Sequence, residues 1–266
     1  MKDKVILITG GSGSLGRALI PQLLVYNPHS IRILSNNEYE IYSISQEIND
    51  IRVRPLIGDI RDRERMNRAV NGVDYIIHAA ALKHVDLCEY NPIEAVKTNI
   101  LGSINIIDCA IDKGVAKVLA ISSDKAVHPI NIYGATKLAM EKLFVNAGVY
   151  GTTKFSCIRF GNFLGSRGSF LEMVEGNHDA PIPITNENMT RFWIPLEKAA
   201  EFTIKCLMMM KGGEVFIPKM DEEKIVDFVV GRPIEIIGRR AGEKLSEMLF
   251  AEGEVVEDCK EYFLVK

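Results

Sequence analysis

The sequence predicts an α/β fold with a doubly wound parallel sheet, and three observations support this. Short β-branched runs alternate with helical patterns from residue 5 to residue 160. A glycine-rich loop separates the first such run from the first helical pattern. The run VDYIIHAAA is apolar on both faces, as a buried parallel strand requires. The alternation indicates βαβ units with right-handed crossovers.

Each element follows from a local pattern. The expected strands are Val5–Thr9, Ile31–Leu34, Val53–Ile57, Val73–Ala79, Lys117–Ile121 and Phe155–Phe160. Apolar residues at helical spacing predict helices at Leu15–Val25, Tyr39–Asn49, Arg61–Val70, Pro92–Lys113 and Tyr133–Val149. After Asn162 glycine and proline become frequent, so the segment up to Arg191 is predicted to be mostly loop. A helix at Pro195–Met210 and a strand at Glu214–Ile217 are expected to follow.

We therefore expect one large domain, formed by residues 1–163 and 192–218. Residues 164–191 and 219–266 are expected to form a small C-terminal substrate lobe over the carboxyl edge of the sheet. Apolar residues are 47% of the chain and charged residues 25%, which is typical of a globular enzyme. The net charge of −3 and the scattered basic residues argue against a nucleic-acid surface.

The cysteines and the hydropathy indicate a compartment. The five cysteines are far apart and lack a CxxC pair, which favours free thiols in a reducing cytoplasm over disulfides or a metal site. Neither a signal peptide nor an apolar run long enough to span a bilayer is recognisable. We expect a soluble cytoplasmic protein without a membrane partner.

The glycine-rich loop between the first strand and the first helix predicts a Rossmann-type dinucleotide site. Glycines at positions 10, 13 and 16 allow a tight turn, close approach to a pyrophosphate and close packing of helix on strand. The helix N-terminus adds free N–H groups and a partial positive charge. The expected contacts are Gly10, Ser12, Gly13, Ser14, Leu15 and Gly16.

The residue that contacts the adenosine ribose normally lies about twenty positions beyond this loop. Here it is Asn36, which is neither an acid for a free 2′-hydroxyl nor an arginine for a 2′-phosphate. Arg17 or Arg32 could supply positive charge nearby, so the choice between NAD and NADP stays open. Asp59 and Ile60 are expected at the adenine edge. Asp59 could also cap the helix from Arg61.

The segment SSDKAVHPINIYGATK, from Ser122 to Lys137, combines four ionisable groups at the end of a strand. Helical spacing brings Tyr133 and Lys137 to one face, and Asp124 and Lys125 precede them in a loop. Such a cluster can transfer protons. The alternatives are a surface Asp-Lys turn pair and a core tyrosine.

Several motifs together resemble the extended short-chain dehydrogenase/reductase superfamily. They are the glycine loop, Ala79-Ala80-Ala81, YxxxK, HAAALKHVDLCEYNP, RFGNFLGSRGS, MTRFWI and GRRAGEKLSE. Within it the chain looks like the soluble inverting UDP-N-acetylglucosamine 4,6-dehydratases of polysaccharide biosynthesis, whose best-known role is the first step of pseudaminic acid biosynthesis. The similarity covers nearly the whole chain, and the Asp-Lys pair before YxxxK is its most specific element.

The resemblance implies a reaction with a tightly bound, recycled NADP or NAD. Tyr133 takes the 4-hydroxyl proton of the sugar, because Lys137 and a cationic nicotinamide lower its pKa from about 10. Lys137 also holds the nicotinamide ribose, and Ser123 bonds the same sugar oxygen. Asp124 protonates the departing 6-hydroxyl while Lys125 removes the carbon 5 proton, although the residues alone would permit swapped roles. Hydride then returns to carbon 6.

Further contacts are implied by the same resemblance. Ala79, Ala80 and Ala81 would line the cofactor site, together with Tyr133 and Lys137. The expected substrate contacts are Lys83, Asn162, Arg167, Arg191, Arg240 and Glu243. Arg191 and Arg240 suit a diphosphate, and Glu243 could orient an arginine or the uridine ribose. His84 could equally be a solvated loop residue, and Trp193 is expected in the core.

Two departures from the family pattern concern specificity. The regions Phe170–Pro183 and Met220–Ile234 look short, and Asn36 replaces the arginine that is common in the family after the second strand. The Arg-Ala-Gly-Glu-Lys motif also has alanine where the family has proline. The alternatives to a dehydratase are a 4-epimerase or reductase, which does not need Asp124 and Lys125, and a non-catalytic dinucleotide-binding protein. A homo-oligomer is expected, with the helices near Pro92 and Gly134 pairing across a two-fold axis.

Overall fold

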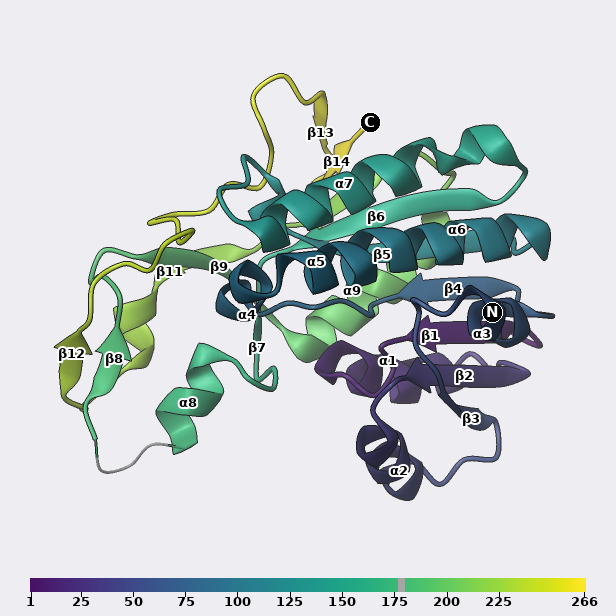
Figure 1. Cartoon of the computed structure of the whole chain (residues 1–266), viewed down its shortest axis with the longest axis horizontal. Helices are drawn as coiled ribbons and strands as arrows, with labels where there is room; N and C mark the ends of the chain where they lie inside the picture. The colour runs from purple at the N-terminus through teal and green to yellow at the C-terminus, as the bar shows by residue number, and fades with distance from the viewer. Residues whose placement is uncertain (177–179) are drawn as a thin grey trace.

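A computed structural model of the chain describes residues 1–176 and 180–266. Its centre is a nine-stranded sheet (Figure 1). In spatial order the strands are β13 (Val256–Asp258), β14 (Tyr262–Val265), β10 (Val215–Pro218), β6 (Lys154–Phe160), β5 (Lys117–Ser123), β4 (Tyr75–His78), β1 (Val5–Thr9), β2 (Ser30–Ser35) and β3 (Val53–Ile57). Strands β10, β6, β5, β4, β1, β2 and β3 run parallel, whereas β14 pairs antiparallel with β10 and with β13. The order reverses at β1, which makes the sheet doubly wound and leaves a crevice at the carboxyl ends of β1 and β4.

Helices cover both faces of the sheet and bury two apolar clusters. One cluster packs α1 (Ser14–Leu24), α2 (Glu38–Glu47) and α9 (Leu196–Met209) against residues such as Ile6 and Ile8 of β1. The other packs α3 (Arg63–Val70), α6 (Gly102–Asp112) and α7 (Ile132–Asn146) against Leu7. Because successive residues of β1 enter opposite clusters, the strand is apolar along its whole length.

A small lobe projects beyond the carboxyl ends of the strands and appears at the left of Figure 1. It contains a three-stranded sheet of β11 (Asp221–Lys224), β9 (Thr190–Pro195) and β7 (Asn162–Leu164). It also contains the pair β12 (Ile234–Ile236) and β8 (Ile182–Ile184), and helix α8 (Phe170–Gly176). A separate apolar cluster around Ile182, Ile184 and Val229 stabilises it.

The sequence expectations hold for the parallel sheet and fail mainly in the loops. Strands β1 and β3 have the expected bounds. The expected helix Pro92–Lys113 is interrupted: α5 (Pro92–Val96) leads into a π-helical turn (Lys97–Leu101) before α6. Helix α4 (Val85–Tyr90) was not expected.

The C-terminal region also differs from the prediction. The predicted loop before Arg191 contains β7, α8 and β8, and includes residues 177–179, which lie outside the described residues. Residues 256–265, expected in the lobe, return to the main sheet as β13 and β14. Short 3₁₀ turns occupy Asp124–Ala126, Ala147–Tyr150 and Ile225–Phe228. Within residues 1–176 and 180–266, no helix is long and apolar enough to cross a membrane.

Candidate active site

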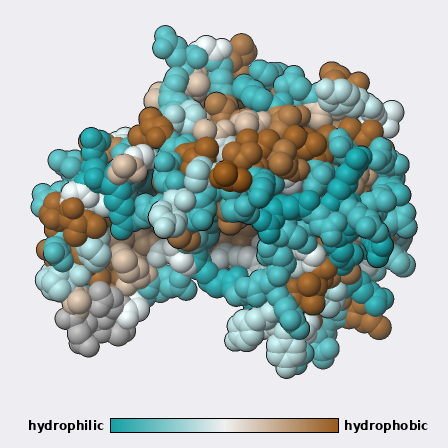
Figure 2. Space-filling model, viewed as in Figure 1, coloured by the Kyte–Doolittle hydropathy of each residue, from teal (hydrophilic) through white to brown (hydrophobic). Residues whose placement is uncertain are grey.

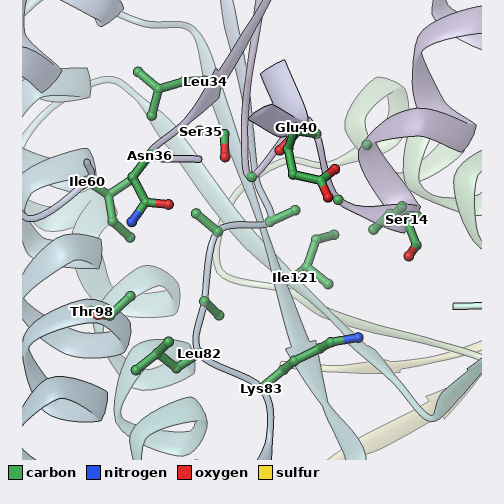
Figure 3. A pocket seen from close by; sticks show the side chains of 18 of the residues that line it. Ser14, Leu34, Ser35, Asn36, Glu40, Ile60, Leu82, Lys83, Thr98 and Ile121 are labelled. Carbon is green, nitrogen blue, oxygen red and sulfur yellow. The ribbon is translucent and has the colours of Figure 1, made fainter. Parts of the chain in front are cut away.

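A cavity of about 730 Å³ opens at the carboxyl ends of β1, β2 and β4 (Figure 3). Apart from Tyr133 and Lys137, all residues predicted from the sequence to contact the cofactor line it. They are Gly10, Ser12, Gly13, Ser14, Leu15, Gly16, Asn36, Asp59, Ile60, Ala79, Ala80 and Ala81. Figure 3 shows Ser14 and Lys83 near one end and Asn36 and Ile60 near the other. The cavity is therefore long enough to involve both the glycine loop and the end of β2.

The glycine loop has the geometry that a pyrophosphate requires. Gly10 has φ +67°, and a Cβ there would lie 2.8 Å from the backbone nitrogen of Ala80. A Cβ on Gly16 would lie 2.3 Å from the Gly11 carbonyl oxygen, so close packing of α1 on the loop excludes any side chain. The N-cap of α1 is Gly13, which offers no side-chain cap. The first N–H groups of α1 are therefore available to phosphate oxygens, and these residues fit a dinucleotide.

Asn36 and Asp59 meet at the far end of this cavity. Asn36 Nδ2 donates to Asp59 Oδ2 at 3.2 Å, and Arg61 Nη2 donates to the same oxygen at 2.7 Å. Burial acts to raise the pKa of Asp59, but the hydrogen bonds from Arg61 and Asn36 lower it overall. The alternative, that Asp59 caps the following helix, is wrong: α3 begins at Arg63 and its N-cap is Asp62.

Two arginines are not where the sequence suggested. Arg32 donates to the carbonyl oxygens of Ala69 and Asn71, at 2.8 and 2.7 Å, and does not line the cavity. Arg167, expected on the substrate, lies instead against the glycine loop. Its Nη2 donates to the Ser12 carbonyl oxygen at 2.6 Å, and its other terminal nitrogen pairs with Glu40. Lys83 Nζ donates to the Arg167 carbonyl oxygen at 2.7 Å.

A second cavity of about 320 Å³ adjoins the first and shares Ala79, Lys83, His84 and Ile121 with it. Its remaining lining includes Lys125, Tyr133 and Lys137 of the predicted proton-transfer cluster, together with Ser123 and the predicted substrate contact Asn162. Asp124, the fourth member of that cluster, does not line it. Trp193, predicted to lie in the core, is buried and also reaches this lining. The two cavities together form a continuous candidate site for a dinucleotide and a second molecule.

Helix α7 positions Tyr133 and Lys137. Asn131 caps it by accepting from the Gly134 nitrogen at 2.7 Å, which sets the helix start just before the tyrosine. Burial lowers the pKa of Lys137 to about 8, and its Nζ donates to the Ile121 carbonyl oxygen at 2.5 Å. Burial also raises the pKa of Tyr133 well above its usual range, a rise that a hydrogen bond with Ser123 only partly offsets. Burial therefore outweighs this hydrogen bond, and the lowering of the Tyr133 pKa by Lys137 and a cationic nicotinamide stays a prediction.

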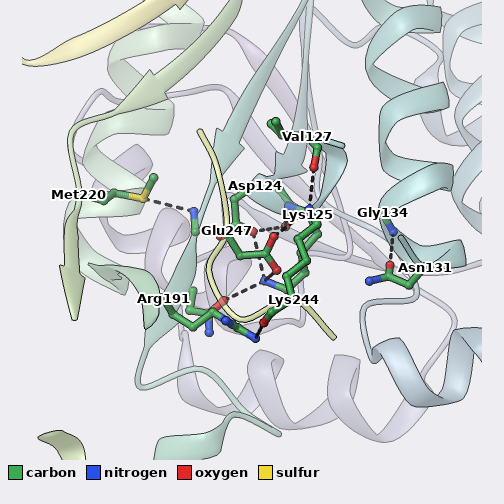
Figure 4. Close-up of polar contacts among 12 residues, drawn as sticks. Asp124, Lys125, Val127, Asn131, Gly134, Arg191, Met220, Lys244 and Glu247 are labelled. Atoms are coloured by element: carbon green, nitrogen blue, oxygen red, sulfur yellow. Dashed lines mark hydrogen bonds and ion pairs between the residues drawn. The ribbon is translucent and has the colours of Figure 1, made fainter. Parts of the chain in front are cut away.

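Asp124 and Lys125 lie in the 3₁₀ turn between β5 and α7, and neither is directed into solvent (Figure 4). Lys125 Nζ lies 3.1 Å from Asp124 Oδ1 and 3.2 Å from Asn162 Oδ1. The Ser123 hydroxyl also donates to Asp124 Oδ1, at 2.9 Å. Asp124 is fully buried, and its Oδ2 has no hydrogen-bond partner among the residues that the structure describes. A buried carboxyl oxygen without a partner is costly and is characteristic of a site that acts on a ligand.

The three residues expected at the substrate diphosphate and uridine lie outside both cavities. Arg191 is buried and donates to the backbone carbonyl oxygens of Thr190, Lys244 and Leu245, so it ties β9 to the C-terminal segment. Arg240 forms an ion pair with Asp86 at 2.7 Å. Glu243 accepts from the Arg240 backbone nitrogen at 3.2 Å, so it contacts this arginine as one alternative supposed.

Sequence reasoning missed a second carboxylate at this site. Glu247, on the segment after Arg240, has Oε1 3.8 Å from Lys125 Nζ and Oε2 3.0 Å from Lys244 Nζ. The side chains of Glu247, Lys125 and Lys244 are all largely buried. The only signal in the sequence was the spacing of Lys244 and Glu247 within GRRAGEKLSE, a spacing that is also common on exposed surfaces.

Fold and site together define a Rossmann-type protein of the short-chain dehydrogenase/reductase superfamily, with a Tyr–Lys pair beside a dinucleotide-sized cavity. The model of one family, described as polysaccharide biosynthesis protein, matches residues 6–266. The chain belongs to this family.

Relatives that are named for different functions are similar to the chain in sequence. The chain is 44% identical over 286 residues to "Uncharacterized membrane protein MJ1061" of Methanocaldococcus jannaschii, covering 99% of the chain and 86% of the relative. It is 46% identical over 259 residues to a UDP-N-acetylglucosamine 4,6-dehydratase (inverting) of Campylobacter jejuni, covering 93% and 78%. A UDP-glucose 4-epimerase of Rickettsia bellii is 36% identical over 284 residues, covering 99% and 83%.

A solved structure has nearly the same fold. Pen from Bacillus thuringiensis superposes with a TM-score of 0.96 at 38% identity, covering 99% of this chain and 88% of that one. The fold and the family predicted from the sequence are therefore confirmed.

Proposed function

We propose that the protein is an NAD(P)-dependent nucleotide-sugar 4,6-dehydratase. The observation that supports this most directly is the Asp124–Lys125 pair beside Tyr133. Lys125 and Tyr133 line one cavity, and the fully buried Asp124 lies 3.1 Å from Lys125 Nζ. Neither oxidation nor epimerisation at carbon 4 needs such a second acid–base pair, whereas elimination of water does.

Each residue has a defined task in this proposal. A nicotinamide dinucleotide in the larger cavity would accept a hydride from carbon 4 of the sugar and return it to carbon 6. Tyr133 takes the proton of the 4-hydroxyl, with Ser123 hydrogen-bonded to the same oxygen. The resulting ketone acidifies carbon 5, so Lys125 can remove its proton while Asp124 protonates the departing 6-hydroxyl. Lys137, whose pKa burial lowers to about 8, holds the nicotinamide ribose.

The substrate we propose is UDP-N-acetylglucosamine, with inversion at carbon 5, because a relative at 46% identity is named for this reaction. Pseudaminic acid biosynthesis is the corresponding role. NADP and NAD both stay open: Asn36 lines the cavity without a carboxylate or guanidinium of its own. We infer that the dinucleotide stays bound and is recycled, because the hydride removed from carbon 4 returns to carbon 6.

The decisive experiment uses the purified protein and UDP-N-acetylglucosamine without added cofactor. The expected product has lost one water, as mass spectrometry would show. The alternative is a 4-epimerase, favoured by relatives named UDP-glucose 4-epimerase. It predicts an unchanged mass, with epimerisation visible by NMR. Binding of nucleotide without turnover would favour a non-catalytic protein and overturn the proposal.

We also infer a homo-oligomer formed through the outer face of α5, α6 and α7. Figure 2 shows hydrophobic side chains gathered on this face. Ile93 of α5, Leu101 of the π-helical turn and Leu87 of α4 are 68%, 49% and 61% exposed. Such a patch is typical of a protein interface. Light scattering that gives a monomer mass would overturn this inference.

The cytoplasmic location stays a prediction, which cell fractionation would test.

A further inference from the structure

The C-terminal segment Gly242–Glu247 reaches the catalytic cluster from the small lobe. Asn131, the N-cap of α7, donates to the Gly242 carbonyl oxygen at 2.8 Å. Lys244 Nζ donates to the Val127 carbonyl oxygen at 2.6 Å, immediately beyond the turn that contains Lys125. Figure 4 shows Glu247 and Lys244 beside Asp124 and Lys125. The segment is therefore attached to both ends of the loop that joins the catalytic turn to α7.

Glu247 occupies a central place in this contact. Its two carboxyl oxygens face different lysines, with Oε1 3.8 Å from Lys125 Nζ and Oε2 3.0 Å from Lys244 Nζ. Its side chain is 3% exposed, whereas that of Lys125 is 16% exposed. Lys125 lines the smaller cavity, and Glu247 lines neither of the two cavities described above. Glu247 therefore meets the cavity lining through Lys125.

The charges of the cluster balance. Two acids, Asp124 and Glu247, face two amines, Lys125 and Lys244, and the proton shared by the adjacent Asp124–Lys125 pair can lie on either group. A buried carboxylate is costly unless it is paired, so the position of Glu247 depends on its lysines. In turn, three oxygens surround Lys125 Nζ: those of Asp124, Asn162 and Glu247, at 3.1, 3.2 and 3.8 Å.

We propose that Glu247 is the positioning residue for Lys125 and stabilises the charge that Lys125 acquires in the elimination step. This inference rests on the proposed dehydratase function. When neutral Lys125 takes the proton from carbon 5, the C–H electron pair moves into the carbon 5–carbon 6 double bond and the 6-hydroxyl leaves with a proton from Asp124. Positive charge then builds up on Lys125 Nζ in a poorly solvated place. The Glu247 carboxylate favours that charge and keeps Nζ directed at carbon 5.

The proposal separates two parts of the reaction. Oxidation at carbon 4 depends on Tyr133 and Lys137, which have no hydrogen bond or ion pair with Glu247 among the contacts of the described residues. The Glu247 charge acts to raise the pKa of Tyr133, so loss of Glu247 should slow proton removal at carbon 5 and should not slow hydride removal from carbon 4.

The test compares Glu247→Gln with Glu252→Gln, which makes the same chemical change at an exposed residue of the same C-terminal region. With UDP-N-acetylglucosamine, Glu247→Gln should form the dehydrated product roughly 100-fold more slowly, while Glu252→Gln matches the wild type. Reduced nicotinamide should accumulate transiently in Glu247→Gln, visible by its absorbance. Deuterium at carbon 5 should slow Glu247→Gln more than it slows the wild type.

Other outcomes would overturn the proposal. Equal rates for the two variants would show that Lys125 does not need Glu247. Equal slowing of oxidation and elimination, with an unchanged isotope effect, would indicate a purely structural role. If Glu247→Gln does not fold, Glu247→Asp retains the charge at a greater distance, and an isotope effect unchanged from the wild type would then refute the proposal. A wild type that removes no water would instead refute the dehydratase function itself.

Discussion

Two buried ionic clusters hold the C-terminal part of the chain against the main sheet. In the first, Arg159 of β6 is bidentate to Glu141 of α7 and also to Glu254, and it donates to the Leu249 carbonyl oxygen. The second joins Asp124, Lys125, Glu247 and Lys244. Both connect a strand end or turn of the large domain to the segment after residue 240.

They differ in how completely their charges are paired. Burial acts to lower the pKa of Arg159, but the hydrogen bonds that it donates to Glu254 and Glu141 hold it above its usual value. Arg159 lines neither cavity. In the second cluster Asp124 Oδ2 has no partner in the described part of the chain, and Lys125 faces a cavity. A saturated cluster can only stabilise the fold, whereas an unsaturated one retains groups that can bind or transfer a proton.

The largest expected effect comes from removing the base of the second cluster. Lys125→Met should reduce the rate of dehydration by about 100- to 10,000-fold, because no other group would take the carbon 5 proton. Product mass measured over time, with Lys198→Met on the exposed face of α9 as control, checks this. If Lys125→Met kept the rate of the control, the second cluster would be structural like the first.

Breaking the first cluster should affect stability and leave the chemistry intact. Arg159→Met would leave Glu141 and Glu254 buried without their partner, at a cost of about 3–5 kcal/mol in the free energy of unfolding. Urea denaturation followed by circular dichroism measures this cost. Adding Glu141→Gln and Glu254→Gln to the same variant should restore most of the loss, because no buried charge then remains. A loss below about 1 kcal/mol for the single variant would contradict the comparison.

Lys137 sharpens the comparison through pH. Unlike Arg159, it pairs with no carboxylate within residues 1–176 and 180–266, and burial lowers its pKa to about 8 from an ordinary 10.5. Between these values the unfolded chain keeps a proton that the folded protein has lost, so the contribution of Lys137 to the free energy of unfolding rises with pH. We expect the free energy of unfolding of the wild type, minus that of Lys137→Met, to rise by a few kcal/mol from about pH 8 to about pH 10. Urea denaturation at both values measures it, and a constant difference would contradict the lowered pKa.

The parallel sheet was predictable because its signal is local. Buried strands such as Val5–Thr9 must be apolar on both faces, and the glycine loop marks the first crossover. The small lobe gives no such signal. All four residues of β11 are charged and exposed, and they form a strand only because β9 offers its edge. The π-helical turn at Lys97–Leu101 likewise accompanies a contact distant in sequence: the Asn99 side chain bonds both backbone groups of Leu82.

The candidate site shows the same limit. Asp124, Lys125, Tyr133 and Lys137 lie within one short segment, so spacing alone brings them together. Glu247 reaches Lys125 through the fold of the lobe, and its sequence neighbourhood resembles an exposed ion pair. Arg191 was expected to bind a diphosphate because guanidinium groups suit phosphates, yet the same donors suit backbone carbonyl oxygens equally well.

A third ionic cluster, at the rim of the larger cavity, gives the smallest expected effect on stability. Glu40 pairs with both Arg17 and Arg167, and the Arg167 side chain is 43% exposed. Because exposed ion pairs contribute little, Arg167→Ala should change the free energy of unfolding by less than about 1 kcal/mol. It should nevertheless weaken dinucleotide binding several-fold, since the Arg167 side chain contacts the glycine loop at the Ser12 carbonyl oxygen.

Titration calorimetry with NADP and with NAD measures this change in affinity. The matched control is Arg68→Ala: Arg68 is an exposed residue of α3 that pairs only with Glu64 among the described residues. If Arg167→Ala lost several kcal/mol of stability with unchanged affinity, Arg167 would belong with Arg159 as a structural residue. A larger loss of affinity for NADP than for NAD would indicate that Arg167 contacts the 2′-phosphate. Equal losses would place its contribution at the pyrophosphate, which both cofactors share.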